Sequence, residues 1–396
     1  MTVSSPAQKS GSSEGWGIIA LLSAAQFVMV IDATVMNVSI SRIVADLGTT
    51  VIGIQTAITT FTLVMAAFML TGGKLGDRFG ARKAFMVGLA IYGLGSLTTS
   101  IAPSLPFLLL GWSLLEGLGA VLVIPAIVAL ISANYSGKRR TMGFGIVGGV
   151  AGAAAAAGPI IGGLVTTYAS WRLVFASETV MCVVILLAAR KLASPDPDTS
   201  KRFDMAGAVL SVLGLGALVF GVLQSSQWGW VTPTAQVPQI GGKAFAPLGY
   251  SPVLLLIIVG VTLIAVFVRW EERVSRTGNQ PLLDLTLLQI PRLRAGLSML
   301  LVQQFVIAGT FFIIPLYLQT VLGLDAMSTG MRLMPLSGAL LVCALAGAAL
   351  AGRFSPRAIV RTGLYSILLA ELVLQLSIEP TLRLSLIHIS EPTRPY

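Results

Sequence analysis

The segment GGKLGDRFGARK, residues Gly72 to Lys83, decides the fold of this chain. It contains four basic residues and one acid, Asp77, and its glycines permit a tight turn and a close approach between helices. An apolar run lies on each side of it, Ile52–Gly72 before and Ala84–Ile101 after. Because a helix needs about 20 apolar residues to cross a bilayer, the segment is predicted to be a short connection between two membrane spans.

Apolar runs of this kind recur along the whole chain. Of its 396 residues, 55% are hydrophobic and 11% are charged, whereas a soluble domain carries about 25% charged residues. This composition excludes a disordered chain and a nucleic-acid-binding domain, and it predicts a protein embedded in a lipid bilayer. Every span should be an α-helix, because lipid cannot satisfy free backbone groups. The eleven predicted spans are Trp16–Ile40, Ile52–Gly72, Ala84–Ile101, Phe107–Ile131, Met142–Tyr168, Leu173–Ala189, Met205–Leu223, Pro252–Val268, Ala295–Leu322, Met327–Ala351 and Ala358–Ile378.

The residue types that carry metal or nucleophilic chemistry are scarce. Two cysteines, Cys182 and Cys343, lie far apart in apolar runs, and the one histidine, His388, lies close to the C-terminus. Such a set gives no disulfide framework, no zinc site and no catalytic triad. We therefore expect neither an enzyme nor a cofactor nor a metal site.

The basic residues are distributed unevenly between the two sides of the membrane. If the N-terminus is cytoplasmic, twenty of the Lys and Arg residues fall on the inner side and four on the outer side. Cytoplasmic loops carry an excess of Lys and Arg, so this asymmetry predicts a multi-pass protein of the cell (inner) membrane with a cytoplasmic N-terminus. It also accounts for the formal net charge of +10 without a nucleic-acid partner.

The spans and the charged segments between them predict how the chain is divided. The parts are a cytoplasmic N-terminus (1–15), a six-helix N-terminal half (16–190), a cytoplasmic linker (191–204), two extra spans (205–268), a cytoplasmic segment (269–294), the first three helices of a C-terminal half (295–383) and a tail (384–396). Within the cytoplasmic segment, Pro281–Ile290 is predicted to lie on the membrane surface.

The tail has an unusual sequence. Its first eleven residues, LSLIHISEPTR from Leu384 to Arg394, resemble the conceptual translation of an adapter used in sequencing libraries. The resemblance implies that the tail is an artefact and that the native chain continues beyond about Arg383, with its last three spans missing here. The alternative is a genuine polar tail, which would leave the second half incomplete and the chain a non-transporting remnant.

The connection between the second and third spans also resembles a known pattern, the signature loop of the major facilitator superfamily. The positions that carry the resemblance are Gly73, Gly76, Asp77, Arg78, Gly80, Arg82 and Lys83. A simple basic anchor would need the bases but not the glycines and the acid. The corresponding place in the second half, Ala351–Arg357, reads AGRFSPR and is a weaker echo, with Pro356 where the acid would stand.

This resemblance implies an all-α membrane protein with a major facilitator fold, built from two pseudo-symmetric six-helix halves. In that fold, we expect Asp77 to pair with a base or with a helix N-terminus in one transport state and to lose that partner in another. The segment Gly72–Lys83 is therefore predicted to gate the inner side of the membrane.

The fifth span is rich in glycine and ends with a second motif. Gly158, Pro159, Gly162 and Gly163 resemble the motif associated with the antiporters of the superfamily, as opposed to its symporters. Small residues four positions apart let another helix approach closely, and a proline permits a bend. The alternative is that these residues serve tight packing alone.

The first span contains IDATVMNVSI, Ile31 to Ile40. Its Asp32, Thr34 and Asn37 resemble the first-span motif of the fourteen-span drug:proton antiporters, which carry two extra spans between their halves. The fourth span departs from the pattern of many relatives, because Ser113 and Glu116 stand where those relatives carry an Arg and a Gln. A mechanism that depends on that arginine therefore does not transfer to this chain.

Four acids lie inside predicted spans, namely Asp32, Glu116, Glu178 and Glu371. A charge at the centre of a span costs about 2.5–3.5 kcal/mol, and no basic residue lies at similar depth in the first six spans. We predict that Asp32, Glu116 and Glu178 bind protons and substrate in an acidic cavity. Asp32 has the alternative role of a hydrogen bond to a neighbouring helix, Glu178 that of a partner for Arg172, and Glu371 is expected to serve packing.

An acid that binds either a proton or a cation, but not both at once, couples the two. The sequence thus predicts a secondary active transporter that exports lipophilic, cationic drugs or other small molecules by proton antiport and alternating access. Its expected partners are the small-molecule substrate, protons and the bilayer. The alternatives are an exporter of an endogenous metabolite or antibiotic, and a membrane protein that does not transport.

Overall fold

The fold is known from a computed structural model of the chain. The residues that it describes are 14–190, 192, 203–240, 243–277, 280–323, scattered positions between 331 and 350, and 354–377. The predicted span Met327–Ala351 lies largely outside the described residues, and the tail from Leu384 onward lies wholly outside them.

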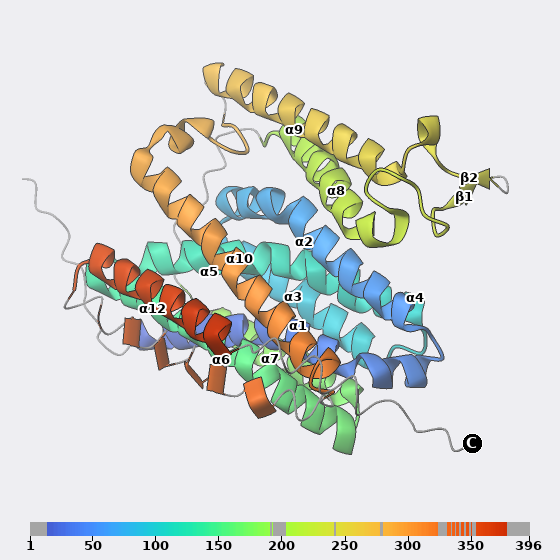
Figure 1. Ribbon diagram of the computed structural model, residues 1–396. Helices are drawn as coiled ribbons and strands as arrows, with labels where there is room; N and C mark the ends of the chain where they lie inside the picture. The colour runs from blue at the N-terminus through green and yellow to red at the C-terminus, as the bar shows by residue number, and fades with distance from the viewer. Residues whose placement is uncertain are drawn as a thin grey trace, which may run out of the picture.

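The described chain is almost entirely helical, which confirms the predicted fold class (Figure 1). A two-stranded hairpin, β1 (Gln239–Ile240) with β2 (Lys243–Ala244), lies in the connection between α8 and α9. The helices are α1 (Glu14–Leu47), α2 (Val51–Phe79), α3 (Ala81–Ser100), α4 (Leu105–Leu108), the π-helix η1 (Leu109–Glu116), α5 (Gly117–Asn134), α6 (Gly137–Tyr168), α7 (Trp171–Ala189), α8 (Met205–Trp228), the 3₁₀ turn η2 (Pro247–Gly249), α9 (Pro252–Arg276), the 3₁₀ turn η3 (Leu285–Gln289), α10 (Pro291–Thr320) and α12 (Pro356–Ser377).

Six of the described helical segments are long and apolar enough to cross a membrane, and α6 makes a seventh if its two parts form one span. Those parts, Gly137–Ala155 and Ile160–Tyr168, are bent by 41° relative to each other, around the predicted bend at Pro159. Helices α3, α10 and α12 also coincide with predicted spans. The chain is therefore a multi-pass membrane protein.

The connection predicted over Gly72–Lys83 is much shorter than expected. Helix α2 continues to Phe79 and α3 begins at Ala81, so that the turn is made at Gly80, with φ of 91°. The reason is that basic residues and glycines can continue a helix, and Gly72 packs its backbone against Val121 of α5, where a methyl group would overlap it. Within the segment Gly72–Lys83, Gly80 alone has a backbone conformation that L-residues rarely adopt.

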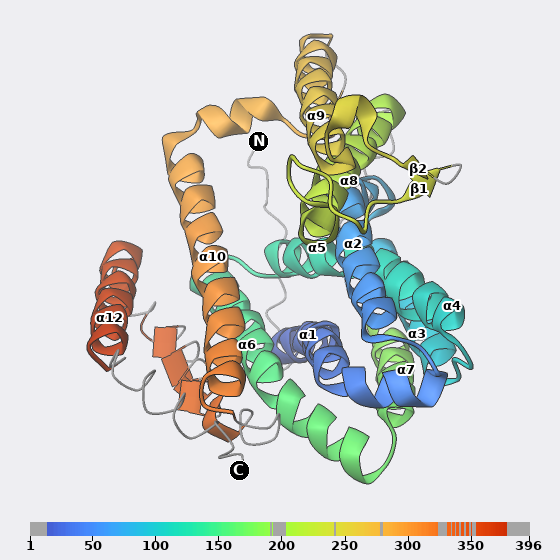
Figure 2. The ribbon, with the colours of Figure 1, turned by 45° about the vertical axis from the view of Figure 1, so that its right-hand side comes forward.

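The first six predicted spans form one bundle, from α1 to α7. One apolar cluster joins α1, α3 and α5 through residues such as Leu22, Phe85 and Leu130, all fully buried. A second joins α1, α2, η1 and α7 around Met36, Ile54 and Phe175. Figure 2 shows α10 and α12 to one side of this bundle.

Helices α8 and α9 pack against each other as a pair, and this pair lies beside α2 (Figure 1). Glycine makes their contact close, because a Cβ on Gly260 would lie 2.7 Å from the backbone nitrogen of Leu218 and 3.0 Å from the carbonyl oxygen of Gly214. In the segment predicted to lie on the membrane surface, Leu282 is buried against Ala208 and Phe267, and the position of this segment at the membrane stays a prediction.

Candidate functional site

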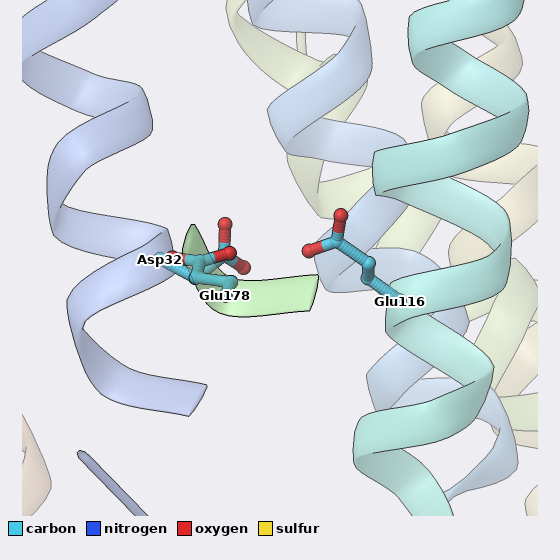
Figure 3. Close-up of side chains that lie close together, drawn as sticks. All are labelled: Asp32, Glu116 and Glu178. Carbon is cyan, nitrogen blue, oxygen red and sulfur yellow. The ribbon is translucent and has the colours of Figure 1, made fainter. Parts of the chain in front are cut away.

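Three of the four predicted intramembrane acids converge on one point. Asp32 of α1, Glu116 at the end of η1 and Glu178 of α7 each offer a carboxylate oxygen, and these three oxygens lie within 4.8 Å of one another. The side chains are at most 1% exposed. Figure 3 shows the carboxyl group of Glu116 pointing towards the carboxyl groups of Asp32 and Glu178. We refer to these residues as the three-carboxylate cluster.

Gly95 of α3 makes room for Glu116 in the cluster. A Cβ on Gly95 would lie 2.6 Å from Cγ of Glu116 and 2.7 Å from the carbonyl oxygen of Gly111, so the glycine leaves room for the acid. One turn further along α3, the hydroxyl of Thr99 donates to Oε1 of Glu116 at 3.2 Å. Glu116 is also the last residue of a π-helix. Such helices are rare in proteins, and those that occur are often found at functional sites.

Asp32 is held by a tryptophan that the sequence analysis missed. Nε1 of Trp112 donates to Oδ1 of Asp32 at 2.8 Å, and its ring stacks on Phe61 with centroids 4.8 Å apart. The signal was present in the sequence, since Trp112 precedes Glu116 by four residues in the same span. A buried indole N–H needs an acceptor, and Asp32 provides it.

Several oxygens in and around the cluster have no hydrogen-bond partner among the described residues. They are Oδ2 of Asp32, Oε2 of Glu116 and both carboxylate oxygens of Glu178. Tyr92 and Ser96 lie one turn apart on α3, where the hydroxyl of Tyr92 is placed to donate to Asp32 and that of Ser96 to donate to Glu116 and Glu178. Within the same part of the chain, no Lys or Arg forms an ion pair with these carboxylates.

The alternative pairing of Glu178 with Arg172 is wrong. Arg172 instead forms an ion pair with Asp46 of α1, donates to the carbonyl of Ala102 at 2.7 Å and lies over the ring of Trp171. The reason is helical geometry, because residues six positions apart on a helix face directions about 120° apart. Glu178 is therefore free to join the cluster.

Glu371 does not belong to the cluster. It lies on α12, and its side chain is exposed in the part of the chain that the structure describes. The packing contact expected for it is therefore not seen among the described residues. Ser113, which stands where many relatives carry an arginine, is fully buried and donates to the carbonyl of Ala57 at 2.8 Å. It ties η1 to α2 next to the cluster.

The other residues of the first-span motif meet the fifth-span motif. A methyl group on Gly158 would overlap Oγ1 of Thr34, and one on Gly162 would lie 2.9 Å from Val35. Thr34 also donates to the carbonyl of Ile31 at 2.8 Å. These motif residues therefore bring α1 and α6 close together.

Two motif residues lie outside this close contact. The amide of Asn37 donates to the carbonyl of Ala33 at 2.9 Å, within its own helix. Gly163 has more room than the other motif glycines, because a Cβ there would lie 3.7 Å from Val38. Nothing in these contacts requires either residue to touch a substrate.

The predicted gating residues cluster at the end of the bundle where α2 meets α3. Arg82 donates to the carbonyl of Arg190, after the end of α7, while Asp77 and Lys83 are exposed. Among the described residues Asp77 forms no ion pair, so its state-dependent partner stays a prediction. Methyl groups on Gly73 and Gly76 would make only ordinary contacts, at 3.7 and 3.6 Å.

Comparison with known families decides the class of protein. The model of the family described as "Major Facilitator Superfamily" matches residues 22–382. The chain belongs to the major facilitator superfamily. Its fold agrees, because the chain resembles the solved structure of the proton:xylose symporter XylE with a TM-score of 0.53 at 12% identity, over 87% of this chain and 70% of that one.

This member of the superfamily has relatives named for resistance and export. It is 29% identical to the "Tetracenomycin C resistance and export protein" of Streptomyces glaucescens, over 86% of this chain and 60% of that protein. It is 32% identical to the "Puromycin resistance protein pur8" of Streptomyces alboniger, over 90% of this chain and 65% of that protein. The chain thus spans about two thirds or less of the length of these two relatives.

Proposed function

We propose that the full-length protein is a secondary active transporter that exports lipophilic, cationic drugs or related small molecules in exchange for protons. The observation that carries the proposal is the three-carboxylate cluster. It gathers three buried acids from three helices, with no basic partner among the described residues. The relatives named for resistance and export favour a drug-like substrate.

The cluster suits exchange for an electrostatic reason. Three carboxylates so close together in a low dielectric cannot all carry uncompensated charge. Protons supply the compensation in one state, and a cationic substrate supplies it in the other. Because each excludes the other, release of the substrate on the outside is tied to uptake of protons there, and the protons leave on the inside.

Movement between the two states would follow the alternating-access scheme, in which one half rocks against the other around a midplane site. The close contact of α1 with α6 at Gly158 and Gly162 provides a smooth surface for such movement. In the proposal, Asp77 and its neighbours gate the inner side, and Pro159 bends α6 as the gate opens.

The proposed topology has fourteen spans, with the two extra spans α8 and α9 between the halves. The N-terminus is cytoplasmic, the protein lies in the inner membrane, and the boundaries of the parts are those given by the sequence. The pairing of α8 with α9 beside α2 supports their treatment as an added unit.

The test measures efflux driven by a pH gradient. Inside-out vesicles that contain the full-length protein accumulate a lipophilic cationic dye when their lumen is acidified, and Glu116→Gln and Asp32→Asn variants should lose this accumulation. Asp46→Asn is the matched control, because it removes a carboxylate of the same span outside the cluster. Full accumulation by both cluster variants, at equal protein levels, would refute the proposal.

A second candidate is export of an endogenous metabolite, favoured by the relative whose name joins tetracenomycin C resistance with export. The same vesicles distinguish the two. An extract of the source organism that competes with the dye, and a purified component of it that is itself accumulated, would favour the metabolite.

A further inference from the structure

We propose that the connection between α8 and α9 binds the bilayer and anchors these two helices at the membrane surface. We call this connection the α8–α9 loop; it comprises residues 229–251, of which the structure describes 229–240 and 243–251. In the anchor, Leu248 and nearby aromatic side chains lie in the headgroup region, at the top of the lipid acyl chains. The loop is separate from the three-carboxylate cluster, so lipid binding by the loop goes beyond the proposed function, and either proposal can fail without the other.

The α8–α9 loop joins two helices that are long and apolar enough to cross the membrane. Helix α8 ends at Trp228 and α9 begins at Pro252. Figures 1 and 2 show the loop at this end of the pair, with η2 on the side away from α2. Within the described part of the chain, α9 packs mainly against α8, so most of its surface is left for lipid. The headgroup region is about 5–8 Å thick on each side of the hydrocarbon core, and residues next to these helix ends lie at that level.

The base of the loop is closed by hydrogen bonds of Ser251. Its backbone nitrogen donates to the carbonyl of Val231 at 2.8 Å, and its hydroxyl donates to the carbonyl of Gly229 at 2.6 Å. Ser251 is buried, and so is Val237 further along the loop. The loop is therefore a folded unit whose backbone is fixed relative to the ends of α8 and α9.

Large apolar side chains are nevertheless exposed on this folded loop. In the described part of the chain they are Trp230, Val231, Phe245, Leu248 and Tyr250. Four of these five lie within four residues of the end of α8 or the start of α9. Trp and Tyr are enriched where a membrane meets water, and exposed apolar surface marks sites of interaction. These side chains continue the lipid-facing surface of α9 to the membrane surface.

Leu248 gives the most specific indication. Its side chain is 97% exposed, and its backbone has φ of 54° and ψ of 23°, the left-handed conformation. Glycine or asparagine adopts this conformation more readily than leucine does. In water, a leucine at this position would be unfavourable both for its backbone and for its exposed side chain. In contact with lipid, the same side chain would be removed from water, which favours leucine.

The charge of the loop agrees with a lipid partner. From Gln224 to Tyr250 the sequence contains no acid and one basic residue, Lys243. Lys243 belongs to β2 and precedes the start of α9 by nine residues, so it stands apart from the apolar side chains next to the helix ends. Surfaces that face water usually carry both signs of charge. The part of the loop next to the helix ends instead has the uncharged, aromatic character of a membrane interface.

The experiment measures how deeply position 248 lies in the bilayer. A fluorophore is attached to Leu248→Cys in the full-length protein, in nanodiscs of phosphatidylcholine brominated either near the headgroups or near the ends of the acyl chains. Cys343, which is exposed, and any other reactive cysteine are replaced by serine, whereas Cys182 is buried and stays. The matched control is Gln236→Cys, an exposed position of the same loop, eight residues beyond the end of α8.

We expect the label at Leu248→Cys to lose most of its emission to bromine near the headgroups, less to bromine near the chain ends and little to iodide in the buffer. The label at Gln236→Cys should respond to iodide and not to bromine. Equal quenching by iodide at the two positions would overturn the proposal, because Leu248 would then lie in water. Protection from both quenchers would also overturn it, because another part of the chain or a second copy would then cover Leu248.

A variant without a fluorophore guards against a label that itself seeks lipid. Leu248→Asn makes the side chain polar and suits the left-handed backbone better than leucine. If the loop lay in water, this variant should be more stable than the wild-type protein. With the proposed anchor, it should instead lower the midpoint temperature of unfolding in nanodiscs, and a higher or unchanged midpoint would overturn the proposal.

Discussion

Replacement of Gly95 by alanine should loosen the contact that positions Glu116. The added Cβ would lie 2.6 Å from Cγ of Glu116, 2.7 Å from the carbonyl oxygen of Gly111 and 2.8 Å from the backbone nitrogen of Glu116. Two of these three atoms belong to the backbone, so a change of side-chain rotamer cannot relieve the overlap. Helix α3 and the π-helix η1 would have to separate, and Glu116 would move with η1.

The expected cost can be estimated from a matched variant. Overpacking of a tight interface costs about 1–3 kcal/mol, whereas glycine to alanine within a helix gains about 1 kcal/mol from helix propensity. Gly216→Ala, in the membrane span α8, should show the gain without the cost, because its Cβ would meet nothing closer than Ala67 at 3.9 Å. The difference between Gly95→Ala and Gly216→Ala should therefore be about 1–3 kcal/mol, since the propensity gain cancels.

The measurement is equilibrium unfolding of both variants in mixed micelles with increasing amounts of a denaturing detergent. Proton-driven dye accumulation should fall in Gly95→Ala and persist in Gly216→Ala. If the two variants are equally stable and equally active, the close contact between α3 and η1 does not position Glu116, and the account of the cluster given above is wrong.

Three further substitutions test other contacts by the same unfolding assay. Gly158→Ala should destabilise the protein by about 1–3 kcal/mol, because its methyl group would overlap the side chain of Thr34 on α1. Gly163→Ala should be nearly neutral, because its Cβ would lie 3.7 Å from Val38. Equal effects of the two substitutions would contradict the close packing of α1 and α6. Gly80→Ala should cost about 1–3 kcal/mol of stability, because alanine disfavours the backbone conformation at this position, whereas Gly73→Ala should carry no such cost. A neutral Gly80→Ala would show that the turn between α2 and α3 does not need the backbone conformation of Gly80. Asp46→Asn should cost about 1 kcal/mol or less, because exposed ion pairs contribute little, and a larger loss would mean that this pair is shielded from water.

Much of the helical framework could be predicted from the sequence. Apolar length places α7 and α8 within a few residues of the predicted spans Leu173–Ala189 and Met205–Leu223. The ends of α1 and α9 were predicted too early, since these helices continue to Leu47 and Arg276. Apolarity marks where a chain leaves the lipid, whereas a helix continues for as long as its backbone bonds are unbroken.

The candidate site could be predicted only in part. Each acid of the cluster was visible as a rare charge in an apolar span, but their convergence depends on how α1, η1 and α7 are rotated about their axes. No single-sequence pattern fixes that rotation. The contact between Asp32 and Trp112 was missed for the same reason, because it joins residues far apart in the chain.

The π-helical segment η1 has a consequence for the comparison of related sequences. A π-helix closes its hydrogen bonds one residue later than an α-helix, so η1 holds an extra residue within the same length of span. A relative without that residue would turn the rest of the helix by about 100°. An ungapped alignment would then match Glu116 with a side chain that faces away from Asp32, and the true counterpart of Glu116 would appear one position away.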